Sequence, residues 1–340
     1  MTGTVVTRRA LAAAALAFAL IGGAPARAEV QAVRISRGYG IHYLPMFVME
    51  RQKLLEKHAA AAGLGDVTVT WSAIDGGNQI NDAMLSGALD IATLGVPGFL
   101  VLWDKARGNA KLEVRGIALM SVGPMWLNSR IDSVKTLADF TERDRIALAG
   151  IKVSYGAVVL QMMVAAQFGQ ANYAKLDPLT VGLPYPEAVV ALTGGKTEIT
   201  AHIASPPFNQ IELDHPGIHR VANSHDVLGD LPVIMAHTTR RFHDANPKLI
   251  ASFLAALDEA CRFVSNDKPG AAKLYAEAAN VKTSDQLALR ILQDPENRFG
   301  ITPVGMMRFA TFLHAVGTLK NQPESWKDLF FPEVHDLPGS

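Results

Sequence analysis

The chain has 340 residues, 49% of them hydrophobic, and its 32 Lys and Arg balance its 32 Asp and Glu. This length predicts one large or two medium domains with ample core, and the absence of a basic excess argues against a nucleic-acid partner. The single cysteine, Cys261, excludes an intrachain disulfide and a cysteine metal cluster, and its apolar helical surroundings predict a buried thiol.

Residues 1–28 have the order of a secretory signal peptide. Arg8 and Arg9 precede a 12-residue apolar run, and Ala26-Arg27-Ala28 follows as an A-x-A cleavage site. The run is shorter than the roughly 20 residues that a membrane span needs. We therefore expect cleavage after Ala28 and a periplasmic protein, with a buried N-terminal helix as the alternative. The arginine pair also partly matches a twin-arginine signal, which leaves the export route open.

The next segment alternates strands with helices. A helix over 46–63, closed by Gly63, follows a glycine-rich loop, and a second helix begins at Gly76-Gly77 and ends at Gly87. Three strands are predicted around them, at 33–36, 66–74 and 89–95. This alternation predicts parallel strands joined by right-handed crossovers.

A second unit repeats the first. The strand at 33–36 matches residues 151–154 in residue type, and a helix closed by Gly169 follows. The helix starts at Gly76-Gly77 and Gly95-Val96-Pro97 fall on or beside Pro184-Tyr185 and Ser205-Pro206, 108 residues later. The sequence therefore predicts two α/β units of like topology.

The connections between the units define two lobes. Residues 115–130 are predicted to form two short strands broken at 121–124, and 219–242 to contain a second crossing. The chain from Asn246 onward is predicted to be helical and to pack back on the first unit. We expect lobe one to comprise 29–122 plus 232–340 and lobe two 123–231. Two connections of this kind have the geometry of a hinge.

This ordered series resembles the periplasmic solute-binding proteins of ABC importers, and more narrowly their nitrate, sulfonate and taurine group. The segment GIHYLPMFVMERQKLLEKHAAAAGLGDVTVTW is similar to the group's first crossover, and RIDSVKTLADF to its entry into the second lobe. The segment NPKLIASFLAALDEACRFVSNDK is similar to its C-terminal helices. The resemblance implies a periplasmic binding protein-like II fold, each lobe being a mostly parallel sheet flanked by helices.

The resemblance also implies a function. We expect a monomeric receptor, not an enzyme, that closes over a small, anionic organic solute and delivers it to a membrane permease, without cofactor or metal. Sulfonate, taurine and nitrate are the expected solute classes. The alternatives are a pyrimidine-precursor binding protein, an enzyme resembling thiamine pyrimidine synthase, and a ligand-sensing partner of a membrane sensor.

Small residues at the helix starts predict the binding site. The first turn of a helix offers unpaired N–H groups and a partial positive charge, and parallel sheets place their ligand crevice where these helices begin. An aromatic loop around His42 could add an N–H donor and ring contacts. The predicted ligand-binding residues are Tyr39, His42, Tyr43, Gly76, Gly77, Asn78, Gly95, Val96, Pro97, Ser121, Ser154, Tyr155 and Ser205.

Several of these residues have a structural alternative. Asn78 and Ser205 could serve only as helix caps, and His42 and Tyr43 could only pack their loop. His202 is expected to be a core histidine. His215 and His219 have a spacing that suits zinc on a helix, but Pro216-Gly217 between them argues against a helix and hence against that site.

Overall fold

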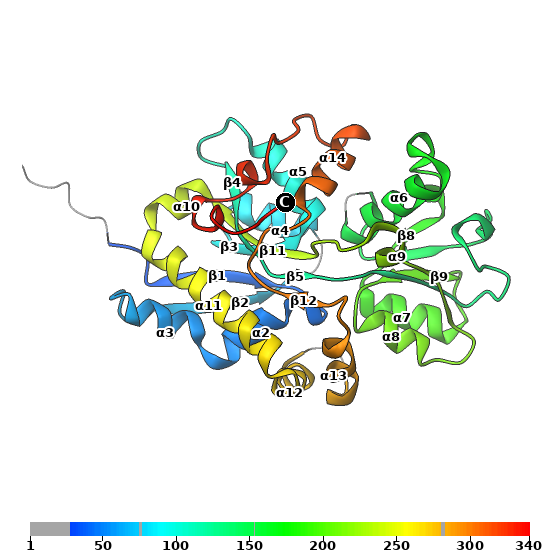
Figure 1. Cartoon of the computed structure of the whole chain (residues 1–340), viewed down its shortest axis with the longest axis horizontal. Coiled ribbons are helices and arrows are strands. Elements are labelled where there is room, and N and C mark those ends of the chain that lie inside the picture. The colour runs from blue at the N-terminus through cyan, green and yellow to red at the C-terminus, as the bar shows by residue number, and fades with distance from the viewer. Residues whose placement is uncertain (1–27, 75–76, 153, 280–282) are drawn as a thin grey trace, which may run out of the picture.

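The computed structural model describes residues 28–74, 77–152, 154–279 and 283–340. The expected signal peptide up to Arg27 and Gly76 lie outside these residues. Figure 1 shows two α/β bodies side by side along the long axis of the molecule. Within the described residues, no helix is long and apolar enough to cross a membrane.

The first body is built on the sheet β2-β1-β3-β11-β4. Strand β1 pairs in parallel with β2 and β3, whereas β11 is antiparallel to both β3 and β4. Four of its strands therefore run in one direction. The bounds are β1 (Ala32–Arg37), β2 (Thr68–Ala73), β3 (Ile91–Gly95), β4 (Val114–Leu119) and β11 (Ile234–Thr239).

The second body repeats this arrangement in the sheet β10-β6-β9-β7-β8. Here β7 is parallel to β8 and β9, and β6 is antiparallel to β9 and β10. The bounds are β6 (Trp126–Ser129), β7 (Ile146–Leu148), β8 (Thr180–Gly182), β9 (Ala201–Ala204) and β10 (His219–Asn223). The fold class is confirmed: each sheet is mostly parallel, with one opposed strand in the same place of the order.

Helices cover both faces of each sheet. On the first sheet, α2, α3 and α11 lie on one side and α4, α5 and α14 on the other (Figure 1). The first body contains α2 (Leu44–Gln52), α3 (Leu54–Ala61), α4 (Gly77–Leu85), α5 (Val96–Ala106), α10 (Arg240–Ala245), α11 (Pro247–Asn266), α12 (Lys268–Ala278), α13 (Asp285–Gln293) and α14 (Met306–Ala315). The second contains α6 (Tyr155–Phe168), α7 (Tyr185–Gly194), α8 (Phe208–Leu213) and α9 (Ser224–Leu228).

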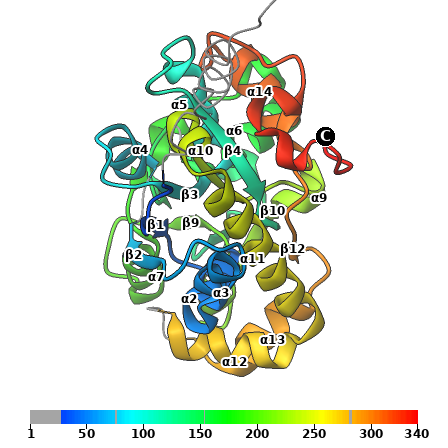
Figure 2. The same cartoon turned by 90° about the vertical axis from the view of Figure 1, so that its left-hand side faces the viewer.

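Helix α11 is the longest helix that packs on the first body, and it runs across the outer end of that body (Figure 2). Its buried face includes Phe253, Leu257 and Cys261, and the helix packs against α2 and α3. Cys261 Sγ lies 3.8 Å from Met120 O. Cys261 is 2% exposed, and this burial raises the pKa of its thiol. The predicted burial of the cysteine is confirmed.

Two chain crossings join the bodies. β5 (Ser121–Val122) continues from β4 toward β6, and residues 229–233 return from α9 to β11. β5 pairs antiparallel with β12 (Arg298–Phe299), a segment that follows α13, and Gly123 N–H donates to Leu231 O at 3.1 Å. Figure 1 shows β5 and β12 between the two bodies. We propose the lobes with the sequence-based boundaries, 29–122 plus 232–340 and 123–231.

Three sequence-based expectations about elements are wrong. The break expected at 121–124 contains a strand, β5, at Ser121–Val122. The strand expected at 151–154 is replaced by β7, because Ile151 lies 50% exposed in a turn and Lys152 has φ +70°, outside the extended region. The single helix expected over 46–63 is divided into α2 and α3, because Lys53 between them is left-handed with φ +53°.

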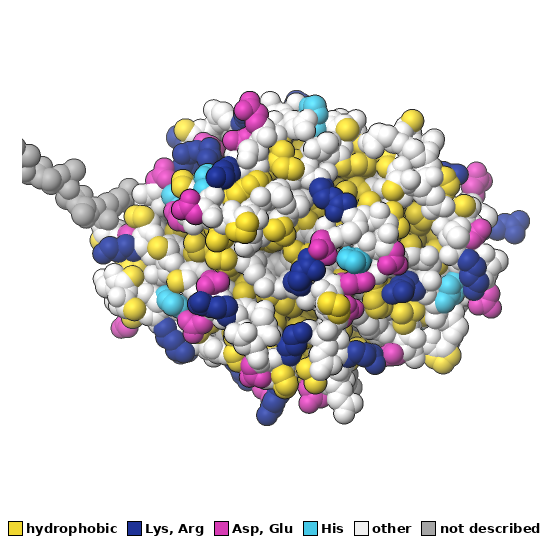
Figure 3. Space-filling view, viewed as in Figure 1, with side chains coloured by type: hydrophobic (Ala, Val, Ile, Leu, Met, Phe, Trp, Pro, Cys, Tyr) yellow, Lys and Arg dark blue, Asp and Glu magenta, His cyan; other side chains and the backbone are white. Residues whose placement is uncertain are grey.

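Each sheet has its own ion pair at the amino ends of its strands. Arg34 of β1 binds Asp90 at 2.7 Å, and Arg145, just before β7, lies 3.9 Å from Glu198. Asp90 and Glu198 thus occupy equivalent positions, just before β3 and β9. On the face drawn in Figure 3, acidic and basic side chains are mixed.

Candidate ligand-binding site

A cavity of about 80 Å³ lies where helices of both sheets begin. The starts of α4 and α5 reach it from the first body, and those of α6 and α7 from the second. Each of these helices follows the carboxyl end of a parallel strand, which is where such sheets bind ligands. The lining is Tyr39, His42, Tyr43, Gly77, Ile80, Leu94, Gly95, Gly98, Ala149, Ser154, Tyr155, Gly156, Tyr185, Ser205, Val233 and Ile234.

The loop after β1 shapes one wall through its two glycines. A Cβ on Gly38 would lie 2.6 Å from the Tyr43 ring, so only glycine lets this ring fold back over the loop. Gly40 has φ +95°, and a Cβ there would lie 3.2 Å from Pro206 O of the second body. The loop therefore presents Tyr39, His42 and Tyr43 to the cavity while lying against the opposite lobe.

The start of α5 brings main chain close to the second body. Gly95 precedes the helix in extended conformation, and Pro97 occupies the first turn, where its missing N–H costs nothing. A Cβ on Gly95 would lie 3.0 Å from Cβ of Tyr155. Glycine here allows the first turns of α5 and α6 to meet at the cavity.

The second body contributes the starts of two helices. Ser154 caps α6 by accepting from Ala157 N–H at 3.2 Å, and its hydroxyl donates to Gly150 O. The next two residues, Tyr155 and Gly156, line the cavity in the first helical turn, where N–H groups have no intrahelical acceptor. Tyr185 begins α7, and its ring stacks on Phe208 with centroids 4.9 Å apart.

The two bodies touch beside the cavity. Ile41 N–H donates to Pro206 O at 3.2 Å across the gap. The rings of Tyr155 and Phe309 lie 5.6 Å apart, and those of Tyr173 and Phe312 lie 6.1 Å apart in an edge-on arrangement. The cavity is small because the lobes are in contact around it.

His42 is the most unusual side chain in the lining. It is 2% exposed, and neither ring nitrogen has a hydrogen-bond partner among the described residues. Burial lowers the pKa of its imidazole to about 3, so the ring is neutral at pH 7. It packs against Gly123 of the first crossing, where a Cβ would lie 2.3 Å from the ring. His42 therefore touches both the cavity and a segment that joins the lobes.

The Tyr155 hydroxyl is a second polar group without a partner among the residues described. Its burial raises the pKa of the phenol well above its ordinary value, so it remains a donor. The described lining contains no Lys, Arg, Asp or Glu. Buried polar groups normally have partners, so His42 and Tyr155 mark where a bound molecule would supply acceptors.

The structure brings together eight of the thirteen residues that the sequence predicts for binding. These are Tyr39, His42, Tyr43, Gly77, Gly95, Ser154, Tyr155 and Ser205. Gly76 lies outside the described residues. The cap alternative for Ser205 is wrong, because Pro207 is the residue that precedes α8 and no side chain caps that helix.

Four predicted residues lie away from the cavity. Val96 and Pro97 are buried on the core side of α5, and Val96 N–H donates to Val233 O at 3.2 Å. Asn78 is exposed within the first turn of α4 and is not its cap. Ser121 is fully buried in β5, where it pairs with Phe299. The sequence placed these residues in a loop or in the first turn of a helix, but it did not indicate whether their side chains point toward the cavity.

The sequence reasoning missed Tyr185 and the residues at the start of β11. Tyr185 carried a signal, since the repeat aligned it with Gly76-Gly77. Behind its ring, His202 of β9 is fully buried and bonds through Nδ1 to Glu212, and Asn128 Nδ2 donates to the same carboxylate at 2.9 Å. His202 thus lies in a core polar network, as expected. Val233 and Ile234 lie where the second crossing enters β11, and the sequence that predicted the crossing did not indicate which of its residues line the cavity.

A larger cavity of about 520 Å³ lies at the opposite, amino end of the first sheet. It is lined by one body only. Of its charged side chains, Arg34 and Asp90 are paired through two side-chain hydrogen bonds, and Lys111 and Arg241 also line it. The smaller cavity combines both bodies, four helix starts and unpartnered donors. We therefore take the smaller cavity as the candidate site.

Comparison with known proteins agrees with this geometry. A family model described as the NMT1-like family matches residues 26–280. No curated protein matches the chain. The alkanesulfonate-binding protein SsuA from Xanthomonas axonopodis pv. citri, bound to MOPS, is 18% identical over 87% of this chain and 96% of its own, with a TM-score of 0.64.

Two further solved structures have the same fold. The periplasmic aliphatic sulphonate-binding protein SsuA from Escherichia coli is 17% identical over 90% of this chain and 99% of its own, with a TM-score of 0.64. The periplasmic nitrate-binding protein NrtA from Synechocystis PCC 6803 is 13% identical over 88% and 85%, with a TM-score of 0.68. At these identities the likeness establishes the fold.

Proposed function

Because the chain belongs to the NMT1-like family, we propose that it is a periplasmic solute-binding receptor of an ABC importer, which closes over its solute and delivers it to a permease. The convergence of helix starts from both sheets on one cavity carries this proposal. The first turns of α5 and α6 already lie together at the cavity, so hinge motion would open the cavity to admit a solute and close it again to exclude water. Such closure is how two-lobed binding proteins couple binding to recognition.

We propose a small solute with one anionic or strongly polar end. The lining has no cationic side chain among the described residues, so negative charge would be met by first-turn N–H groups, the neutral His42 ring and the Tyr155 hydroxyl. The aromatic rings of Tyr39, Tyr43, Tyr155 and Tyr185 offer contact for an organic part. A cavity of about 80 Å³ holds about three water molecules at roughly 30 Å³ each, which suits a compact solute such as nitrate, taurine or a short alkyl sulfonate.

A thermal-shift screen over these classes, with pyrimidines and aromatic acids included, tests the proposal. A solute at about 100 times its Kd stabilises the folded state by about 2.7 kcal/mol, which corresponds to a rise in Tm of about 4 °C for a chain of this size. The receptor function predicts such a rise without conversion of the solute. Absence of a shift with every class, or turnover of a compound that does bind, would overturn it.

A further inference from the structure

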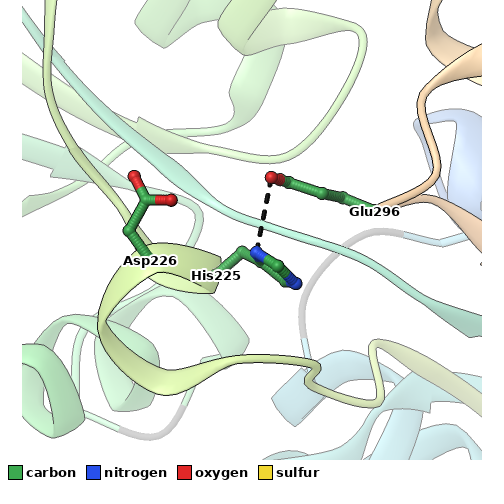
Figure 4. A group of neighbouring side chains, drawn as sticks. All are labelled: His225, Asp226 and Glu296. Carbon is green, nitrogen blue, oxygen red and sulfur yellow. Dashed lines mark ion pairs between the residues drawn. The ribbon is translucent and has the colours of Figure 1, made fainter.

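A second group of side chains lies away from the ligand cavity, beside the crossings. His225 and Asp226 belong to α9, and Glu296 lies just before β12. Figure 4 shows their imidazole and two carboxylates around one space. One ligand atom from each lies within 4.8 Å of the others. We propose that these three residues bind a divalent transition-metal ion of the zinc class and so join the two lobes beside the hinge.

The separation of His225 and Glu296 suits a tetrahedral ion. His225 Nδ1 lies 3.4 Å from Glu296 Oε1, and zinc bonds of about 2.0–2.2 Å place neighbouring tetrahedral ligands about 3.3–3.6 Å apart. Asp226 is exposed at the same side and has no ion-pair partner among the described residues, so its carboxylate is free to complete the set. Water would take the fourth position.

The imidazole is already oriented by a further carboxylate. His225 Nε2 lies 3.3 Å from Asp230 Oδ1. When Nε2 carries the proton and donates it to Asp230, the lone pair of Nδ1 faces Glu296 and is available to a metal. Metal-binding histidines characteristically donate their other N–H to a carboxylate in this way. Asp230 is held in turn by Arg298 at 2.5 Å.

Glu296 is also held in place by a neighbouring amide. Asn223 Nδ2 donates to Glu296 Oε2 at 3.1 Å, while Asn223 Oδ1 caps α9 by accepting from His225 N–H at 3.0 Å. The same asparagine thus fixes the helix that carries two ligands and the carboxylate that supplies the third. A nitrogen ligand with only two carboxylates favours a zinc-class ion over Mg²⁺ or Ca²⁺, which prefer six or more oxygen ligands.

Isothermal titration of the metal-stripped protein with Zn²⁺ tests the site. One Zn²⁺ per chain should bind, with Mg²⁺ failing to compete. Asp226→Asn and Glu296→Gln should each raise the Kd at least tenfold, and Asp230→Asn by about 10- to 100-fold through loss of the histidine's orientation. Co²⁺ should give the strong visible absorption of a four-coordinate ion, and each substitution should weaken it.

The exposed Asp285, in the first turn of α13, provides the matched control. Asp285→Asn should leave zinc affinity unchanged, and melting without metal should be equal for Asp226→Asn and the unmodified protein, since Asp226 is exposed. The chain has ten histidines, so weak surface binding is expected in any case. No saturable uptake, or uptake that Asp226→Asn and Glu296→Gln both leave unchanged, would overturn the proposal. Solute binding is measured separately, and its failure would not affect this result.

Discussion

At the scale of single residues, His42 is the most informative side chain of the site. Its ring is buried, and neither nitrogen has a hydrogen-bond partner in the described part of the chain. Leaving a buried donor or acceptor unsatisfied costs about 1–3 kcal/mol. A solute that accepts a hydrogen bond from His42 would recover part of that cost on binding. His237 of β11 is a second fully buried histidine with both nitrogens unpartnered among the described residues, beside Phe99 and away from the cavity.

These two histidines make a matched pair for mutation. His42→Phe keeps a ring of similar size and removes its polar atoms, so we expect about tenfold weaker solute binding with no loss of stability in the empty protein. His237→Phe should likewise cause no loss of stability, and it should leave the affinity for solute unchanged. Calorimetric titration and urea unfolding measure the two quantities. Equal solute affinity in both variants would remove His42 from the site.

The same histidines predict an acid-sensitive fold. Burial lowers the pKa of each to about 3 in the folded protein, against about 6.5 when unfolded. Below pH 6.5 the unfolded chain therefore binds protons that the folded chain refuses, and stability falls as pH decreases toward 3. Within that window each histidine lowers the free energy of unfolding by about 1.4 kcal/mol for each pH unit of acidification, and above pH 6.5 neither changes it.

Urea unfolding at pH 7, 6 and 5 measures this slope before most carboxylates titrate. The unfolding free energy of the unmodified protein should fall between pH 6 and 5 by more than that of the double variant His42→Phe/His237→Phe. The difference between the two slopes should be about 2.7 kcal/mol per pH unit. A slope equal to that of the unmodified protein would show that the two imidazoles protonate without unfolding.

Residue identity at the site was only partly predictable from sequence. The aromatic loop after the first strand predicted Tyr39, His42 and Tyr43 at the site, and all three line the cavity. Ser121 could not be excluded, because its burial depends on pairing with Phe299, which lies 178 residues away in the chain. The repeat aligned Tyr185 with Gly76-Gly77, but its place in the lining and its stacking on Phe208 became known only from the structure.

At the scale of elements, short glycine-containing junctions place the helix starts. The predicted boundaries at Gly95 and Gly169 agree with the structure, since Gly95 precedes α5 and Gly169 caps α6. The strand β7 was missed because it is only three apolar residues long. Its neighbour at 151–154 copied the residue types of β1, and pattern alone cannot separate such a strand from a turn.

Gly95→Ala tests the approach of α5 to α6. Its new Cβ would lie 3.0 Å from Cβ of Tyr155, which forces the two helix starts apart. We expect about tenfold weaker solute binding and a larger radius of gyration with solute present, measured by small-angle scattering. Gly194→Ala adds a methyl at the end of α7 with no atom within 4 Å, and it should change neither quantity. Equal behaviour of the two variants would contradict the proposed closure.

At the scale of the whole molecule, two bodies with like sheets lie side by side. They are joined by crossings that come from distant parts of the chain. The repeat in the sequence predicted the two units, and the sheet orders agree with it. The pairing of β5 with β12 and the cluster of His225, Asp226 and Glu296 could not be predicted, because they join segments far apart in the sequence. The central claim is that a solute binds between the lobes and contacts both.

Titration calorimetry of Tyr155→Phe with the best solute from the screen tests that claim most directly. This change removes only a hydroxyl of the second lobe that has no partner among the described residues. Loss of one hydrogen bond worth about 1–2 kcal/mol predicts roughly 5- to 30-fold weaker binding, alongside the loss caused by His42→Phe in the first lobe. Unchanged affinity in both variants would place the solute outside this cavity and contradict the account.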